Sequence, residues 1–100
     1  MTEYQVDIAP AAEGDIREAF VWYRDRNARA AQDFRSEVFS AIERIAQGPL
    51  IRAADENGTR KRILRRFPYT VMYEVNRRLI TILAVAHQRR QPGYWRKTKI

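Results

Sequence analysis

The chain lacks several residue types and patterns on which common catalytic functions depend. It contains no cysteine, so disulfides and thiolate metal ligands are excluded and a reducing compartment is expected. His87 is the only histidine, and no acidic residue lies near it in the sequence. The four glycines are scattered and form no phosphate-binding loop. We therefore expect neither a metal site nor a cofactor.

Membrane and nucleophile-based functions also find little support. No apolar run approaches the roughly 20 residues that cross a bilayer. The N-terminus has no basic leader followed by a long apolar region, so a cytoplasmic protein is expected. The only serines, Ser36 and Ser40, lie on a predicted helix, and nothing places them beside His87. A serine–histidine catalytic pair is therefore not predicted.

Positive charge is concentrated in the second part of the chain. Residues 1–59 hold 7 Lys/Arg and 11 Asp/Glu, whereas residues 60–100 hold 12 Lys/Arg and a single acid, Glu74. This asymmetry predicts an anionic partner for residues 60–100. Nucleic acid, an acidic protein segment and a membrane surface all fit, and a solvated basic face is the plain alternative.

The first half of the chain reads as a strand followed by two helices. Alternation from Tyr4 to Ile8 predicts a strand, and Pro10 is typical of the first turn of a helix. Apolar residues then recur at three- and four-residue steps up to Tyr23. Asn27 is expected to cap a second helix, which the stop signal Gly48-Pro49 ends. The short connection predicts an antiparallel helical hairpin.

Three strands are predicted after a loop at residues 50–59. Residues 60–66 form a strand-length basic run, and residues 69–76 alternate in polarity up to a hairpin turn at Asn76-Arg77. Residues 79–86 are apolar on both faces, as in a central strand. The first strand must join the same sheet to satisfy its backbone. The expected fold class is α+β, a single domain over residues 1–100 with the helical hairpin on one face of an antiparallel meander.

The last fourteen residues are the most distinctive stretch. Five of the residues from 87 to 100 are basic, none is acidic, and Tyr94 and Trp95 lie among the charges. Arginine binds phosphates bidentately, and aromatic rings stack on unpaired bases. Together with the basic 60–66 run, the stretch predicts a surface that contacts an anionic partner. The residues expected on this basic surface are Arg60, Lys61, Arg65, Arg66, Arg90, Trp95, Arg96 and Lys97.

Plainer structural roles are open to the same residues. His87 can hydrogen-bond a neighbouring carbonyl at a strand end, and Trp95 can anchor the tail by packing on the sheet edge. Arg65 and Arg66 can protect an exposed edge strand from aggregation. If the surface performs chemistry, arginines can stabilise a transferring phosphoryl group while His87 moves a proton near neutral pH. Those parts suffice for metal-free RNA cleavage.

Three motifs follow one another along the chain: Tyr4-x-Val6-x-Ile8-x-Pro10-Ala11-Ala12, Phe67-Pro68-Tyr69-x-Val71-x-Tyr73, and Ile82-Leu83-Ala84-Val85-Ala86-His87-x-Arg89-Arg90-x-Pro92-x-Tyr94-Trp95. In this order they resemble the RelE/ParE superfamily of bacterial type II toxins. The resemblance covers nearly the whole chain and implies two N-terminal helices packed against a small, mostly antiparallel sheet. It also implies a toxin that a cognate antitoxin, usually encoded beside it, holds inactive.

The superfamily divides into RelE-like members, which cut messenger RNA in the ribosome, and ParE-like members, which poison DNA gyrase. RelE-type nucleases use an arginine on the strand that follows the basic one, and here that position is Thr70. They also use a tyrosine where Trp95 falls, with Tyr94 one place earlier. The basic residues that such nucleases carry on the second sheet strand fall in the region of Arg60, Lys61 and Arg62, and Arg89 matches an arginine after the last strand. The resemblance therefore favours a ParE-like toxin that is not an enzyme.

Two alternatives remain open at the level of sequence. The first is a metal-independent, ribosome-dependent mRNA endoribonuclease, with Arg62, His87, Arg89 and Tyr94 as catalytic residues. The second is an inactive family member that only binds its antitoxin. On each reading the basic surface is expected to meet the antitoxin, through an acidic segment, or the cellular target, which is DNA gyrase or the ribosome with its mRNA.

Overall fold

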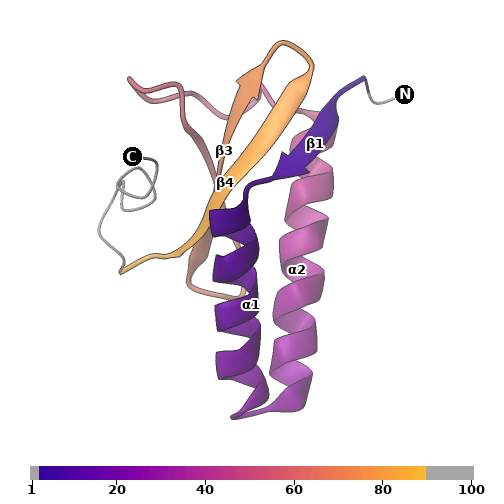
Figure 1. The fold of residues 1–100 in the computed structure, drawn as a ribbon, viewed down its shortest axis with the longest axis vertical. Helices are drawn as coiled ribbons and strands as arrows, with labels where there is room; N and C mark the ends of the chain where they lie inside the picture. Colours follow the sequence, from indigo (N-terminus) through magenta and orange to yellow (C-terminus); the bar gives the residue numbers. More distant parts are fainter. Residues whose placement is uncertain (1–2, 90–100) are drawn as a thin grey trace.

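A four-stranded sheet with a helical hairpin against one of its faces makes up the fold (Figure 1). The computed structural model describes residues 3–89. Its element order confirms the predicted α+β class. Within the described residues no helix is long and apolar enough to span a membrane. The elements are β1 (Gln5–Ile8), α1 (Pro10–Arg24), α2 (Ala28–Gln47), β2 (Arg60–Ile63), β3 (Tyr69–Asn76) and β4 (Leu79–His87).

The sheet joins the two ends of the described chain. Its strand order is β1-β4-β3-β2, so β4 is central and β2 forms one edge. β1 runs parallel to β4, from Gln5 opposite Leu79 to Ile8 opposite Ile82, and the other pairings are antiparallel. The expectations that the first strand joins the sheet and that residues 79–86 form a central strand are confirmed.

Local signals set the helix boundaries as predicted. Pro10 opens α1, where its missing N–H costs nothing because the first helical N–H groups have no intrahelical partner. Asn27 caps α2, and its side-chain oxygen accepts hydrogen bonds from the backbone N–H of Arg29 (2.9 Å) and of Ala30 (3.2 Å). Gly48 is the C-cap of α2. The two helices pack as the expected antiparallel hairpin.

The turn between β3 and β4 lies one residue later than predicted. Asn76 still belongs to β3 and pairs with Leu79, so Arg77 and Arg78 form a two-residue turn. Arg77, rather than Asn76, has the positive φ of 58°. The prediction was wrong because it followed the preference of Asn for the left-handed region, whereas the register of the hairpin placed the turn.

Side chains pack on both faces of the sheet. On the helix side, Val71 and Tyr73 of β3 join Ile80 and Ile82 of β4 and Phe34 of α2 in the main core, all of them fully buried. The opposite face has a smaller buried cluster of three residues, Met72, Leu83 and Ala84. A register shift between Met72 and Tyr73 leaves Leu83 as an extra residue in β4, beside Ala84 in this cluster. Two-sided burial of β4 explains its continuous apolar sequence.

β2 is shorter than the predicted strand at residues 60–66. It ends at Ile63, and the backbone N–H of Leu64 donates to the Tyr69 carbonyl at 2.9 Å. The next two N–H groups, of Arg65 and Arg66, turn to the side chain of Glu37 on α2. The strand stops because a helix side chain, and not a neighbouring strand, accepts these donors.

Candidate partner-binding surfaces

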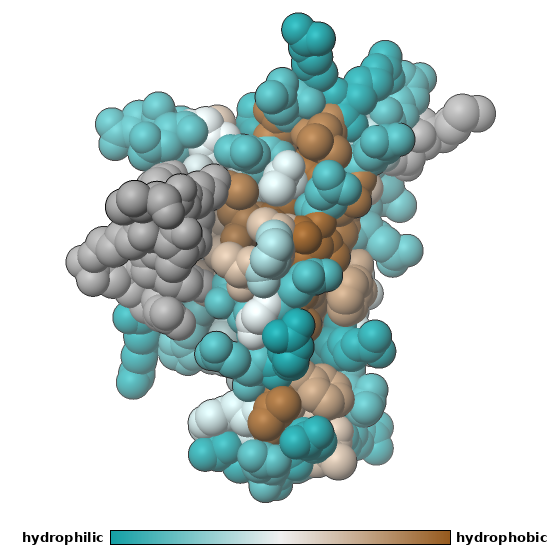
Figure 2. Space-filling view, viewed as in Figure 1, coloured by the Kyte–Doolittle hydropathy of each residue, from teal (hydrophilic) through white to brown (hydrophobic). Residues whose placement is uncertain are grey.

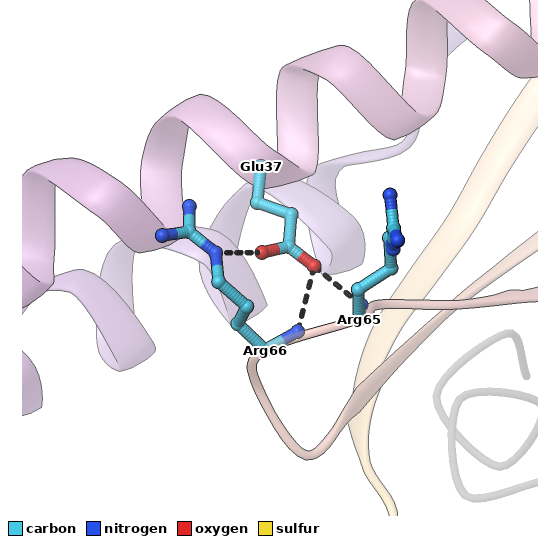
Figure 3. A network of polar contacts seen from close by, with 3 residues as sticks. All are labelled: Glu37, Arg65 and Arg66. Carbon is cyan, nitrogen blue, oxygen red and sulfur yellow. Dashed lines mark hydrogen bonds and ion pairs between the residues drawn. The ribbon is translucent and has the colours of Figure 1, made fainter.

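Glu37 holds the segment that connects β2 to β3 against α2 (Figure 3). One carboxylate oxygen accepts from the backbone N–H groups of Arg65 and Arg66, the latter at 3.0 Å. The other oxygen accepts from Nε of Arg66, also at 3.0 Å. In Figure 3 the Arg65 side chain extends away from this carboxylate. The Arg66 side chain therefore forms an ion pair with Glu37, whereas Arg65 contacts Glu37 through its backbone N–H alone.

The ionised form of Glu37 is favoured by these contacts. Burial alone would raise the pKa of its carboxyl group. The hydrogen bonds from Arg66 and Arg65 and the positive charge of Arg66 outweigh burial, so the pKa lies below its ordinary value. The carboxylate is 13% exposed and the Arg66 side chain 63% exposed, so the hydrogen bonds to the backbone contribute more than the ion pair itself.

The basic residues of β2 divide between the two faces of the sheet. Arg60 lies opposite Tyr73, and Arg62 lies opposite Val71. Because directly opposed residues share a face, both arginines lie on the helix side with these core residues. Lys61 and Ile63 alternate to the other face. The predicted basic surface is thus split along this strand.

Arg62 lies among other arginines on the helix side of β2. Burial, and then the charges of Arg52 and Arg44, lower its pKa below the ordinary value. Tyr73 lies close by, where its buried hydroxyl donates to the Pro49 carbonyl at 2.9 Å. Sequence reasoning missed Arg44 and Arg52. The available signal was the spacing of Arg44, seven residues after Glu37 and so on a similar side of α2.

His87 lines a different hollow, next to α1, with a volume of about 460 Å³. Its ring meets that of Tyr69, which lies opposite it in the sheet, edge-on at a centroid distance of 5.1 Å. Its Nδ1 accepts from the backbone N–H of Arg89 at 3.1 Å, so the expected hydrogen bond at the strand end involves an N–H and not a carbonyl. Asp15 and Trp22 of α1 line the same hollow.

The surroundings of this hollow shift the pKa of Tyr69. Burial raises the pKa of its hydroxyl, and the nearby Tyr23, Asp15 and Glu18 raise it further. The hollow therefore combines aromatic rings with carboxylates, unlike the arginine-rich side of β2. Sequence reasoning missed the contribution of α1 here, because nothing local to the helix indicates that Asp15 lies beside β4.

The proposed ribonuclease residues are not brought together among the described residues. Arg62 lies on β2 and lines a hollow next to α2, whereas His87 lines a separate hollow next to α1. Thr70 points to the opposite face of the sheet from both, since its neighbours Tyr69 and Val71 pack on the helix side. Arg89 follows β4 in an exposed turn. The expected site residues Arg90, Tyr94, Trp95, Arg96 and Lys97 lie outside the described residues.

A third hollow is an apolar groove of about 360 Å³ between the two helices, and Ile8 of β1 also lines it. Ile16 and Phe20 of α1 and Phe39 of α2 line it. Phe39 is 39% exposed, a large fraction for an aromatic side chain on a groove wall. Figure 2 shows hydrophobic side chains at the surface beside β1 and the adjoining part of the helices, between hydrophilic flanks.

Residues 3–89 contain no group of side chains placed to hold a metal ion. No three histidine, aspartate or glutamate side chains lie there in an arrangement that could bind a metal ion. The chemistry that the described surfaces carry is therefore that of arginines, of one aromatic and acidic hollow, and of an apolar groove. All three suit binding to another macromolecule.

Comparison with known proteins relates this architecture to one family. The family model for the ParE toxin of the type II toxin–antitoxin system parDE matches residues 6–92. Among solved structures, a chain of the chromosomal ParDE toxin–antitoxin system from P. aeruginosa is similar in fold, with a TM-score of 0.76 and 16% sequence identity. The match covers 87% of this chain and 98% of that one. No curated protein sequence matches.

Proposed function

Because this chain belongs to the ParE family of type II toxins, we propose that it inhibits bacterial growth by acting on DNA gyrase and that a cognate antitoxin neutralises it. The family match over residues 6–92 carries the proposal. The concentration of positive charge in residues 60–100 adds to it, because gyrase acts as a nucleoprotein complex and presents anionic surface to a basic partner.

Expression of the toxin without its antitoxin tests this proposal directly. We expect growth arrest, with covalent gyrase–DNA breaks that accumulate in the arrested cells. Co-expression with the small protein encoded beside the toxin gene should restore growth. Arrest with intact DNA and cleaved transcripts would instead support the ribonuclease, and harmless expression of folded protein would support an inactive antitoxin-binding member.

The ribonuclease alternative finds less support, because Arg62 and His87 line separate hollows. Mapping of RNA 5′ ends after induction would reveal cleavage. If cleavage occurs, Arg89→Ala and His87→Ala should each abolish it. Cleavage that survives both substitutions would assign the chemistry to other residues.

We propose that the antitoxin binds through two kinds of contact. An acidic segment would cover the basic residues at 60–66 and 87–97, and an apolar stretch would fill the groove beside Phe39. Salt weakens the first contact, because exposed charges are screened over a distance of about 8–10 Å at physiological ionic strength. It does not screen the second contact, which is apolar. The salt dependence of the affinity therefore separates them.

Substitutions in the two surfaces extend this test. Lys61→Gln with Arg65→Gln should weaken antitoxin binding most at low salt, whereas Phe39→Ser should weaken it equally at all salt concentrations. Arg29→Gln, an exposed charge change at the far end of α2, serves as the control. A wild-type affinity that does not vary with salt would remove the acidic segment from the proposal.

A further inference from the structure

Four arginines converge on one pocket between the C-terminal half of α2, the segment after it and β2. The pocket has a volume of about 340 Å³. Arg44 comes from α2, Arg52 from the segment after it, and Arg62 and Arg65 from β2 and its continuation. Glu37 is the one acidic residue in its lining.

The carboxylate of Glu37 is engaged by Arg65 and Arg66 and does not neutralise the other arginines of the pocket. Both of its oxygens accept from Arg65 and Arg66 N–H groups, and its charge pairs with the Arg66 guanidinium. Across residues 3–89, none of the guanidiniums of Arg44, Arg52 and Arg62 forms an ion pair with a carboxylate. Arg65 directs its side chain away from Glu37 (Figure 3). The pocket therefore holds an excess of positive charge.

Arg44, Arg52 and Arg65 are exposed, but the segment that carries Arg52 is held beside β2. Arg60 donates from Nη1 to the Arg52 carbonyl, and the buried hydroxyl of Tyr73 fixes Pro49 just before it. Arg62 is half-buried on the helix side of β2, close enough to Arg44 and Arg52 for their charges to disfavour its own. Like charges held together in this way are best stabilised by an anion that enters between them.

The geometry favours a phosphate over a carboxylate. Arginine side chains that come from three separate elements approach one space from different directions, and a tetrahedral phosphate offers oxygens in several directions. A carboxylate offers two oxygens in one plane and is satisfied by a single guanidinium fork. The pocket also adjoins a second hollow that shares Glu37, Arg44 and Arg65 and adds Ser36, Ser40 and Arg66. Two adjacent basic hollows suit consecutive phosphates of one strand.

We propose that the pocket formed by Arg44, Arg52, Arg62 and Arg65 binds the phosphate backbone of a nucleic acid. The contact is to phosphates, so it reads no base sequence and positions the protein on the strand. This site does not depend on gyrase being the target, since the nucleic acid itself is the ligand. It also differs from the ribonuclease hypothesis, because His87 lies in another hollow and takes no part.

Binding to a short fluorescein-labelled DNA duplex, followed by fluorescence anisotropy across a salt series, tests the site. The triple variant Arg44→Gln, Arg52→Gln and Arg62→Gln should lose about tenfold or more in affinity at low salt. Its slope of log affinity against log salt should be shallower by about 1 to 2, given roughly 0.9 per phosphate contact. Arg17→Gln, Arg24→Gln and Arg29→Gln together remove the same charge from exposed positions elsewhere.

The control triple variant shows whether DNA binds this pocket in particular or responds only to the overall positive charge of the protein. Equal losses for the two triple variants would overturn the proposal, because charge alone would then explain binding. A pocket variant that loses affinity for polyglutamate but keeps its affinity for DNA would also overturn it, since the pocket would then serve an acidic protein segment.

A second measurement uses the unaltered protein and so does not depend on the variants folding. Phenylglyoxal modifies accessible arginines, and mass spectrometry of the digested protein locates the modified sites. DNA should protect Arg52 and Arg62 and leave Arg29 reactive. Protection of all three to the same extent would contradict a specific pocket.

Discussion

Glu37 of α2 holds the β2–β3 connection in place through its side chain. Its side chain accepts two backbone N–H groups that no strand satisfies. Glu37→Gln leaves these donors with a weaker, uncharged partner, and we expect a loss of about 1–3 kcal/mol in the free energy of unfolding. Urea denaturation measures it, with Glu43→Gln, an exposed position on the same helix, as the control.

Glu37 also makes the stability of the fold depend on pH. Because the pKa of Glu37 is lower in the folded state, its contribution to stability is complete above the ordinary value of 4.5 and is lost as the pH falls through the lowered pKa. The stability difference between the wild type and Glu37→Gln should therefore shrink below a pH of about 4.5. A difference that stays constant down to pH 3 would show that the charge contributes nothing.

Tyr73 contributes one buried hydrogen bond and, through it, the position of the segment after α2. Its hydroxyl donates to the Pro49 carbonyl at 2.9 Å, and the side chain is fully buried. Tyr73→Phe keeps the ring and removes this bond, so we expect a loss of about 1 kcal/mol. Thermal unfolding should show it, and Tyr4→Phe, on a partly buried ring, should change the midpoint little.

At the scale of elements, α2 depends on its N-cap. The Asn27 side chain satisfies two of the N–H groups that the start of a helix leaves unpaired. Asn27→Ala should destabilise the protein by about 0.5–2 kcal/mol, and Asn27→Asp should be nearly neutral. Circular dichroism with urea measures both. An alanine variant as stable as the aspartate variant would refute the capping role.

Asp15 of α1 extends the protection of β4 beyond the end of β1. β1 pairs with β4 only as far as Ile82, and further along β4 the Asp15 Oδ2 accepts the N–H of Val85 at 2.9 Å. Asp15→Ala should therefore speed amide exchange at Val85 while Ile80, in the β1-paired part, stays protected. Exchange detected by NMR tests this, with Glu13→Ala as the control. Equal acceleration at both amides would indicate global destabilisation.

Elements whose causes are local could be predicted from the sequence, and those with distant causes could not. Pro10 and Asn27 act on the backbone next to them, so both helix starts were correct. The end of β2 depends on Glu37, which lies on another element, and the strand was therefore predicted too long. Arg77 takes the left-handed conformation because the hairpin register demands it.

In the candidate sites, too, the features with local causes could be predicted from the sequence and those that depend on packing could not. The basic character of residues 60–66 was visible in the sequence, but the alternation that directs Arg62 towards α2 and Lys61 away from it depends on the sheet register. Arg44 and Arg52 join Arg62 only through the packing of α2 beside β2. The hollow at His87 likewise depends on the docking of α1 against β4.

At the scale of the whole molecule, β1 joins the start of the described chain to β4, its last described strand, by parallel pairing. Backbone bonds from Gln5 to Arg78 and from Ala9 to Ile82, at 2.8 and 2.9 Å, bound this pairing. Deletion of residues 1–8 would expose the edge of β4, which is apolar, and should abolish the cooperative unfolding transition. Gln5→Lys, at an exposed position, should leave that transition in place.

The parallel pairing of β1 with β4 also sets when the protein can fold during synthesis. β1 leaves the ribosome early, but its partner strand follows roughly 70 residues later. At about 5–20 residues per second, β1 waits roughly 4 to 14 s for that partner. The helical hairpin can form in this interval, because its contacts are local. The sheet cannot, because its central strand, β4, follows β1, β2 and β3 along the chain.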